Sequence, residues 1–194
     1  MHKYIAEFLG TFLLALAVSL SIVGKFPVPT PVIAALTLGV SVYTLGAISG
    51  THINPAITLG LLAIRKIDLK DAVGYLAAQF AGGAAAMMAA GALASRASAG
   101  ASDSGLVFAC ELIGAFVLAT GVASVVHGHA PAPAAGLTIG GSLLIGISVA
   151  ASGSNGVLNP AVAVAIGSVS ASYLLAPIAG GVLAMLVYRA IAGK

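Results

Sequence analysis

Long stretches without charge constrain this chain more than any other feature. No Asp, Glu, Lys or Arg occurs between Lys25 and Arg65, and none occurs between Glu111 and Arg189. A membrane-crossing helix needs about 20 predominantly apolar residues, so each stretch has room for more than one crossing. Hydrophobic residues make up 60% of the sequence and charged residues 7%, and the mean hydropathy is +1.12. Because soluble domains carry about a quarter charged residues, this composition predicts an integral, multi-pass membrane protein.

Proline, glycine and charged residues divide the sequence into six apolar segments that are long enough to cross a bilayer. We expect spans at about 4–24, 31–49, 70–92, 105–126, 134–151 and 171–191. Two further apolar segments, at about 54–64 and 159–168, have roughly half the length that a crossing needs. We therefore predict an all-α membrane protein in which six transmembrane helices are accompanied by two half-helices that re-enter the membrane.

Basic residues predict the orientation of the chain, because lysine and arginine gather on the cytoplasmic side of membranes. If the N-terminus is cytoplasmic, Lys25 and Arg96 face outward. The other basic residues then face the cytoplasm: Lys3, Arg65, Lys66, Lys70, Arg189 and Lys194. We expect both termini on the cytoplasmic side of a cell or inner membrane.

Sequence motifs recur in the two halves of the chain in the same order. "AEFLGTF" at 6–12 matches "CELIGAF" at 110–116, Asn-Pro-Ala occurs in both halves, and "YLAAQFAGG" at 75–83 matches "YLLAPIAGG" at 173–181. Three ordered matches indicate an internal repeat. Since each repeat holds three crossings, the second copy enters from the opposite side, which predicts an inverted repeat with a pathway between its halves. We interpret residues 1–194 as one channel domain with repeats at about 1–100 and 101–194.

Each half-helix begins with Asn-Pro-Ala. Asparagine is a favoured N-cap, and proline fits the first helical position, where its missing N–H has no cost. Irregular backbone at membrane depth is tolerated where it is buried in protein or lines a water-filled cavity. Two inverted half-helices would meet at their positive ends near the midplane, where the asparagine amides would donate to the lumen and cations would be repelled. The alternative is a packed bundle that contains two capped helices and no pore. The motif residues are Asn54, Pro55, Ala56, Asn159, Pro160 and Ala161.

Taken together, these motifs resemble the major intrinsic protein family, the aquaporins and aquaglyceroporins. The resemblance covers nearly the whole chain and includes "SGTHINPAITLG" and "NGVLNPAVA" around the two tripeptides. It implies six tilted helices with two half-helices, assembly as a homotetramer, and passive transport of water or small neutral solutes. It also implies that four residues brace the re-entrant loops: Glu7, Glu111, His52 and Gln79.

The family's outer constriction, the solute filter, is formed by four positions. In this chain they are Ala34, Ile147, Gly156 and Val162. Most members have arginine at the position of Val162, and water-selective members tend to have an aromatic residue at that of Ala34 and histidine at that of Ile147. We therefore expect a wide, apolar filter that selects by size. It is similar to the filter of some plant tonoplast intrinsic proteins, which pass water with ammonia, urea or hydrogen peroxide, and glycerol also fits sterically.

Two function classes remain open. A passive channel needs only the pore, whereas a proton- or ion-coupled secondary transporter needs an ionisable group at the midplane, for which Glu7, Glu111 and His52 are the candidates. No nucleophile–base pair, metal cluster or phosphate-binding loop stands out in the sequence, so we expect no enzyme, no cofactor and no metal site. Cys110, the only cysteine, is interpreted as a packing residue, and a dispersed net charge of +3 gives no reason to expect a nucleic acid partner. The expected partners are water, small neutral solutes and the lipid bilayer.

Overall fold

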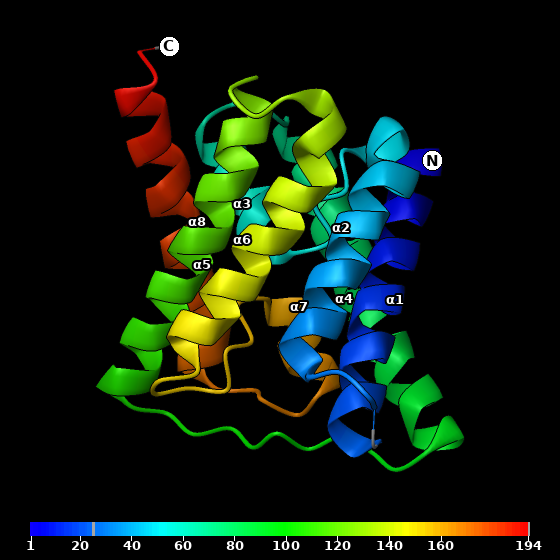
Figure 1. Ribbon diagram of the computed structural model, residues 1–194. Coiled ribbons are helices and arrows are strands. Elements are labelled where there is room, and N and C mark those ends of the chain that lie inside the picture. The colour runs from blue at the N-terminus through cyan, green and yellow to red at the C-terminus, as the bar shows by residue number, and fades with distance from the viewer. Residues whose placement is uncertain (25, 194) are drawn as a thin grey trace.

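The computed structural model describes residues 1–24 and 26–193, and all regular structure within them is helical. Within these residues, six helices are long and apolar enough to cross a membrane. They are α1 (His2–Val23), α2 (Thr30–Ser49), α4 (Leu69–Leu93), α5 (Gly105–Val126), α6 (Ala135–Ala150), which follows the 3-10 turn η1 (Ala132–Ala134), and α8 (Ala171–Ile191). The six predicted spans are confirmed, with ends that differ by at most about two residues. Figure 1 shows the long helices side by side, with both chain ends at the same end of the bundle.

Two short helices, α3 (Pro55–Ala63) and α7 (Pro160–Ala165), complete the fold of the described part of the chain. They contain 9 and 6 residues, too few to cross a bilayer. Both end in a turn in which the residue after the cap adopts a positive φ, +61° at Arg65 and +71° at Gly167. The next backbone N–H then bonds back to the last helical turn, which satisfies carbonyls that a helix end leaves free. This turn ends α7 three residues before the predicted boundary.

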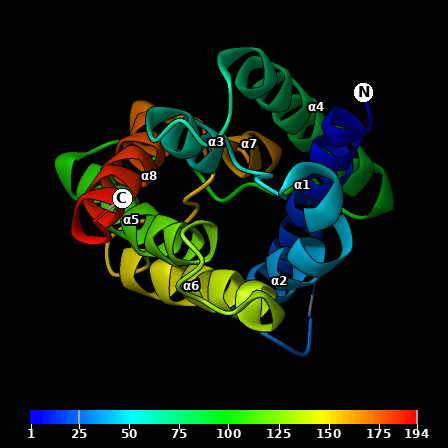
Figure 2. The ribbon, with the colours of Figure 1, turned by 90° about the horizontal axis from the view of Figure 1, so that it is seen from above.

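The two halves of the chain make equivalent contacts. In the first half α1 packs against α2 and α4, and in the second half α5 packs against α6 and α8. Each half-helix packs mainly against a long helix of the other half of the chain: α3 packs against α8, and α7 packs against α4. Figure 2 shows α3 and α7 in the gap that remains between α4 and α8. The fold is the predicted inverted repeat, and its halves are joined through the two half-helices.

Small residues allow each half-helix to lie close to a long helix. A Cβ atom at Gly83 in α4 would lie 2.3 Å from the carbonyl oxygen of Ala161 in α7, and one at Gly181 in α8 would lie 2.7 Å from that of Ala56 in α3. Both distances are shorter than real Cβ contacts, so any side chain at these positions would push the half-helix away. The repeated "AGG" motif therefore sets how closely the half-helices approach the bundle, as small residues do between membrane helices.

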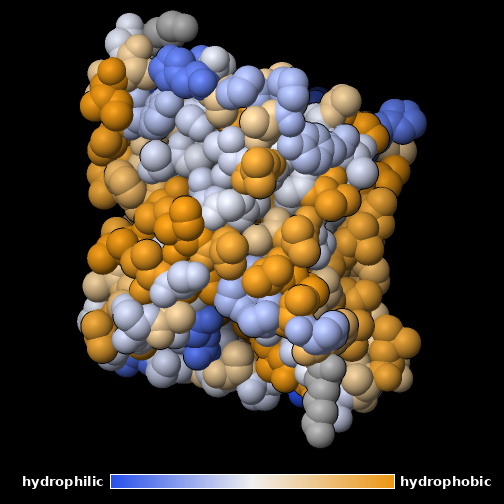
Figure 3. Space-filling model, in the orientation of Figure 1, coloured by the Kyte–Doolittle hydropathy of each residue, from blue (hydrophilic) through white to orange (hydrophobic). Residues whose placement is uncertain are grey.

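The sides of the bundle are apolar and its ends are polar. Large apolar side chains such as Leu36, Leu137 and Leu175 are exposed on the long helices, and Figure 3 shows hydrophobic side surfaces with strongly hydrophilic residues at the ends. The end with both chain termini also holds Lys3, Arg65, Lys66, Lys70 and Arg189. Arg96 follows α4 at the opposite end. Lys25 and Lys194, which the orientation prediction also used, lie outside the described residues.

Candidate functional site

Asn54 and Asn159 cap the two half-helices as predicted. The side-chain oxygen of Asn54 accepts from the backbone N–H of Ala56 at 2.9 Å. That of Asn159 accepts from Ala161 at 3.0 Å and from Val162 at 3.3 Å. Each cap fixes the orientation of its amide group, since the oxygen must face the helix and the NH2 group must face away from it.

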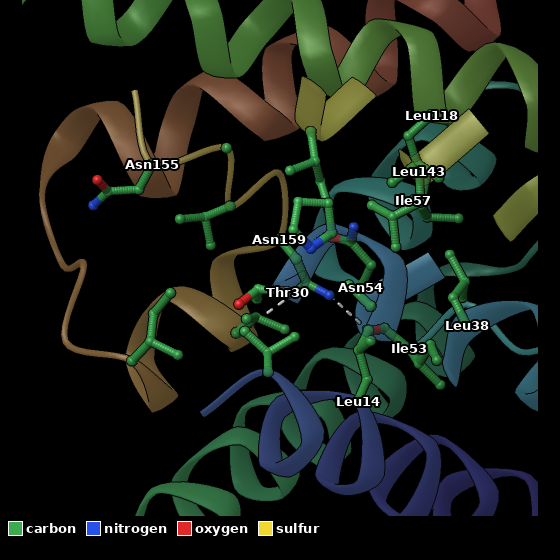
Figure 4. A pocket seen from close by; sticks show the side chains of 18 of the residues that line it. Leu14, Thr30, Leu38, Ile53, Asn54, Ile57, Leu118, Leu143, Asn155 and Asn159 are labelled. Atoms are coloured by element: carbon green, nitrogen blue, oxygen red, sulfur yellow. Dashed lines mark hydrogen bonds between the residues drawn. The ribbon is translucent and has the colours of Figure 1, made fainter. Parts of the chain in front are cut away.

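The NH2 groups of the two asparagines join the halves of the protein. Asn54 donates to the carbonyl oxygen of Leu158 at 3.0 Å, and Asn159 donates to that of Ile53 at 3.0 Å. An amide NH2 group has two hydrogens, so one N–H of each asparagine remains for the lumen. From the sequence, the amide donors of both asparagines are expected to face the lumen. In the structure, one N–H of each asparagine instead bonds to the loop of the other half. Figure 4 shows the two asparagines next to each other.

The loops that lead into the half-helices contain unusual backbone conformations at equivalent positions. φ is +52° at Thr51 and +37° at Ile53 in the first loop, and +63° at Gly156 and +56° at Leu158 in the second. Positive φ is rare for residues other than glycine and is a clear outlier for β-branched residues. Such strain persists only where the surroundings hold the backbone in place.

Glu7 in α1 holds the first loop. Its carboxylate accepts from the backbone N–H groups of His52 at 2.9 Å and Ile53 at 2.6 Å. It also accepts from the side chains of Ser49 at 2.7 Å and Gln79 at 2.8 Å. This carboxylate is fully buried, has four donors and is not among the residues that line the cavity, so it holds the strained loop without facing the pore.

Glu111 in α5 holds the second loop with one donor fewer. It accepts from the backbone N–H groups of Val157 at 2.9 Å and Leu158 at 2.7 Å, and from the hydroxyl of Ser154 at 2.8 Å. Pro177 stands where the repeat of the first half has its glutamine, and proline offers no side-chain donor. The bracing geometry is thus repeated in both halves, whereas among the described residues a fourth donor is found in the first half alone.

His52 is oriented by the same network. Gln79 donates to the hydroxyl oxygen of Thr58 at 2.8 Å, and that hydroxyl lies 3.2 Å from Nδ1 of His52. The Thr58 hydroxyl is thus held between Gln79 and Nδ1 of His52, and this contact orients the imidazole ring. The ring packs edge-on against Tyr75 at 4.9 Å between centroids. His52 therefore combines a backbone N–H that is bound to Glu7 with an oriented imidazole at the cavity wall.

A cavity of about 280 Å³ passes both asparagines and brings together the four predicted filter residues. A Cβ atom at Gly156 would lie 3.0 Å from the carbonyl oxygen of Ile147, so these two filter residues pack directly against each other. Most of the remaining wall is aliphatic (Figure 4). The site residues that line the cavity are Ala34, His52, Asn54, Ile147, Gly156, Asn159 and Val162. Among the described residues, no group of three or more His, Cys, Asp or Glu side chains could hold a metal ion.

Asn155 lies beside the filter and was not singled out from the sequence. Its side-chain amide nitrogen lies 2.9 Å from the carbonyl oxygen of Ala99, 3.0 Å from that of Gly100 and 3.1 Å from the hydroxyl of Ser168. The "NG" dipeptide of "NGVLNPAVA" indicates a turn, but it gives no sign of partners more than fifty residues away. The structure thus adds a contact between the second loop and the segment that joins α4 to α5.

Known proteins resemble the chain over its full length. Its sequence matches the family described as "Major intrinsic protein" over residues 1–188. It is 37% identical over 218 residues to "Glycerol uptake facilitator protein-like 6" of Lactiplantibacillus plantarum, with 100% of both proteins covered. It is 32% identical to "Aquaporin Z" of Rhodopseudomonas palustris, over 98% of this chain and 93% of that protein.

A solved structure shares the fold. The X-ray structure of the aquaglyceroporin from Plasmodium falciparum matches with a TM-score of 0.72 and 23% identity, over 96% of this chain and 94% of that one. Six membrane-spanning helices, two opposed half-helices capped by asparagine, and full-length sequence similarity lead to one conclusion. The chain belongs to the major intrinsic protein family, a family of passive membrane channels.

Proposed function

We propose that the protein is a passive channel for water and for small neutral solutes of the size of ammonia, hydrogen peroxide, urea and glycerol. The filter carries this proposal. Ala34, Ile147, Gly156 and Val162 line one cavity, and none of them has a polar side-chain atom. Such a filter selects by size and leaves hydrogen bonding with the solute to backbone groups.

Val162 is the decisive member of the filter. An arginine at this position would place a charged, planar group with five N–H donors among the filter residues. Valine leaves that volume to the solute and removes the charge. We therefore infer a wider opening than an arginine-bearing filter would have, at the expense of one barrier to cations.

The polar groups at the cavity wall favour neutral solutes over cations. The asparagines Asn54 and Asn159 offer N–H donors, and no Asp or Glu is among the described residues that line the cavity. The N-terminal ends of α3 and α7 add partial positive charge at the same level. A neutral molecule with oxygen or nitrogen acceptors can bond to these donors, whereas a cation meets positive ends and no carboxylate.

The alternative, a proton- or ion-coupled transporter, needs a carboxylate that exchanges protons or ions with the pathway. Glu7 and Glu111 are fully buried, and each accepts two backbone N–H groups of the loop that it braces. Releasing either carboxylate would leave those N–H groups without an acceptor, at about 1–3 kcal/mol each. The uncoupled channel is therefore the function that this geometry supports best.

The test is a comparison of solute fluxes in proteoliposomes for the wild type, Val162→Arg and Val162→Met. We expect Val162→Arg to lower urea and glycerol flux more than water flux, and Val162→Met, which adds length without charge, to have a smaller effect. An equal decrease for every solute with Val162→Arg would refute the role of Val162 in the filter.

Coupling is tested in the same vesicles. The rate of a passive channel follows the solute gradient and does not change when a proton gradient is imposed. Uphill accumulation of solute driven by protons or sodium would overturn the channel proposal in favour of the transporter.

We also propose how the channel sits in the membrane. The end of the bundle that carries Lys3, Arg65, Lys66, Lys70 and Arg189 is placed at the cytoplasmic side of a cell or inner membrane, in agreement with the tendency of basic residues to remain there. By analogy with the family, four copies form a homotetramer, with part of the exposed apolar surface between subunits and the rest in lipid. Protease accessibility from each side and cross-linking in membranes test the two statements.

A further inference from the structure

The chain leaves α5 through a tight turn that carries two histidines, at the end of the bundle that also holds both chain termini (Figure 1). His127 caps α5, and its backbone N–H donates to the carbonyl oxygen of Ala123 at 2.9 Å. Gly128 follows with a φ of +74°, and the backbone N–H of His129 then donates to the carbonyl oxygen of Ser124 at 2.9 Å. Glycine is the favoured residue at this place in a helix-ending turn. Backbone bonds therefore fix the positions of both histidines.

Each imidazole has its Nδ1 atom bonded within the protein. Nδ1 of His127 lies 2.8 Å from the carbonyl oxygen of Ala123. Because a carbonyl oxygen can only accept, Nδ1 carries the hydrogen, and Nε2 of the neutral ring keeps its lone pair. Nδ1 of His129 lies 2.9 Å from the hydroxyl oxygen of Tyr188 in α8, which can accept in the same way. A histidine that binds a metal through one nitrogen usually donates its other N–H to such an outer partner, so both rings have the partner that a metal ligand needs.

The two rings lie at a distance that one metal ion can bridge. Their centroids are 6.2 Å apart. Imidazoles that bind one ion through nitrogen at about 2.0–2.1 Å have ring centres roughly 5–6.5 Å apart, from a tetrahedral to a linear arrangement. Tyr188 packs against both rings, with centroid distances of 5.3 Å to His127 and 5.7 Å to His129. Since α5 packs along α8, this tyrosine holds the pair from the neighbouring helix.

The surroundings of the pair favour an ion that binds to nitrogen. His129 is exposed and His127 is half-buried, so the rings are open to the solvent. The C-terminal ends of α5 and α8 contribute partial negative charge, whereas Arg189 in the last turn of α8 is positive. Residues 123–134 and 185–193 include no Asp or Glu. Ca(II) and Mg(II) need oxygen ligands, so imidazoles without a carboxylate favour Cu(II), Ni(II) or Zn(II) instead.

We propose that His127 and His129 form a binding site for a late divalent transition metal, with both Nε2 atoms as ligands and Tyr188 as the residue that positions His129. Two imidazoles leave the remaining coordination positions to water, so the site is open, unlike a closed site of three or more protein ligands. The Irving–Williams order makes Cu(II) the most tightly bound of these ions and the best probe. None of the three residues lines the cavity, so the site does not depend on the proposed solute range.

Pulsed electron paramagnetic resonance, which detects the imidazole rings bound to Cu(II), tests the ligands. The full chain is purified in detergent without an affinity tag and with His2→Ala, because His2 beside the N-terminal amine would compete for Cu(II). With one equivalent of Cu(II), two bound imidazoles are expected in this parent chain and one in His127→Ala or His129→Ala. A single imidazole in the parent chain, or an unchanged spectrum when both histidines are replaced, would overturn the site.

Isothermal titration calorimetry measures the affinity of the same chains for Cu(II). Loss of an outer partner alone weakens metal binding about 10–100-fold, so loss of either imidazole is expected to raise the dissociation constant by at least about tenfold. A large excess of Ca(II) should leave the dissociation constant for Cu(II) unchanged, and effective competition by Ca(II) would contradict a site made of nitrogen ligands. If His127→Ala does not fold, His129→Ala decides, because the side chain of His129 is exposed.

A pair of tyrosine variants tests the positioning role. Tyr188→Phe keeps the ring and removes the hydroxyl, so it is expected to raise the dissociation constant for Cu(II) by about tenfold while both imidazoles remain bound. Tyr43→Phe is the matched control. It also removes a phenol hydroxyl that holds the connection between α5 and α6, since Tyr43 donates to the carbonyl oxygen of Pro133 at 2.9 Å, but Nδ1 of His129 lies against Tyr188. Equal dissociation constants for the two variants would refute positioning by Tyr188.

Discussion

Replacing Gly156 by alanine is expected to change both stability and selectivity, because this glycine has a positive φ and contacts another filter residue. Its φ is +63°, and an added Cβ would lie 3.0 Å from the carbonyl oxygen of Ile147 and 3.1 Å from its Cγ2. Gly128 is a matched control. It has a φ of +74°, lies outside the cavity, and has no atom within 4 Å of an added Cβ.

The expected loss in the free energy of unfolding is the sum of two contributions. A left-handed conformation costs a residue with a Cβ about 1–2 kcal/mol, and this cost applies equally to Gly156→Ala and Gly128→Ala. The methyl group at position 156 also overpacks the filter, which costs about 1–3 kcal/mol more. The total for Gly156→Ala is about 2–5 kcal/mol, against about 1–2 kcal/mol for the control.

Two assays check this prediction. Thermal unfolding in detergent, followed by far-UV circular dichroism, should give a lower midpoint for Gly156→Ala than for Gly128→Ala. In proteoliposomes the ratio of urea to water flux should fall for Gly156→Ala and stay at the wild-type value for Gly128→Ala. The reasoning is refuted if the two variants have equal midpoints, or if the flux ratio is the same in both.

Three further predictions address packing, bracing and charge. Gly83→Ala forces a Cβ to 2.3 Å from the carbonyl oxygen of Ala161 and should lower the free energy of unfolding by at least about 1–3 kcal/mol. Gly141→Ala in α6, where an added Cβ meets open space, should raise the free energy of unfolding by about 0.5–1 kcal/mol. Glu111→Ala leaves two buried backbone N–H groups without an acceptor and should destabilise the protein by about 2–6 kcal/mol, more than Glu111→Gln, which keeps one acceptor oxygen. Asn159→Asp keeps the capping oxygen, loses the bond to the Ile53 carbonyl and puts a negative charge beside the lumen. Proton leak measured with a pH-sensitive dye should therefore rise, and an unchanged leak would contradict the charge argument.

The sequence alone predicted the parts of the fold that depend on local chemistry. Apolar length predicted the six spans, and the Asn-Pro pairs at Asn54 and Asn159 predicted where the half-helices begin. Each signal is contained in the residues whose local structure it predicts. The ordered motifs also predicted the inverted repeat, because an odd number of crossings leaves no other arrangement.

The resemblance implied that Glu7 and Glu111 brace the re-entrant loops, and in the structure the two carboxylates have equivalent backbone partners. Glu7 and Glu111 each accept from two backbone N–H groups of a loop more than forty residues away. The sequence could not show that Glu7 has four donors and Glu111 three. That difference depends on whether a side chain of α4 or α8 reaches the carboxylate, and proline at position 177 cannot.

Only the tertiary structure decided how the two halves are joined at the pore. One amide hydrogen of each asparagine is used by the opposite loop, and Asn155 holds a segment that the sequence places in an ordinary connection. Hydrogen-bond partners of this kind lie far apart in the chain, and they meet because glycines such as Gly83 let the half-helices approach closely. The sequence by itself therefore determined a membrane-spanning inverted repeat with two half-helices, whereas the packing distances between its halves decided which polar groups were left to face the pore.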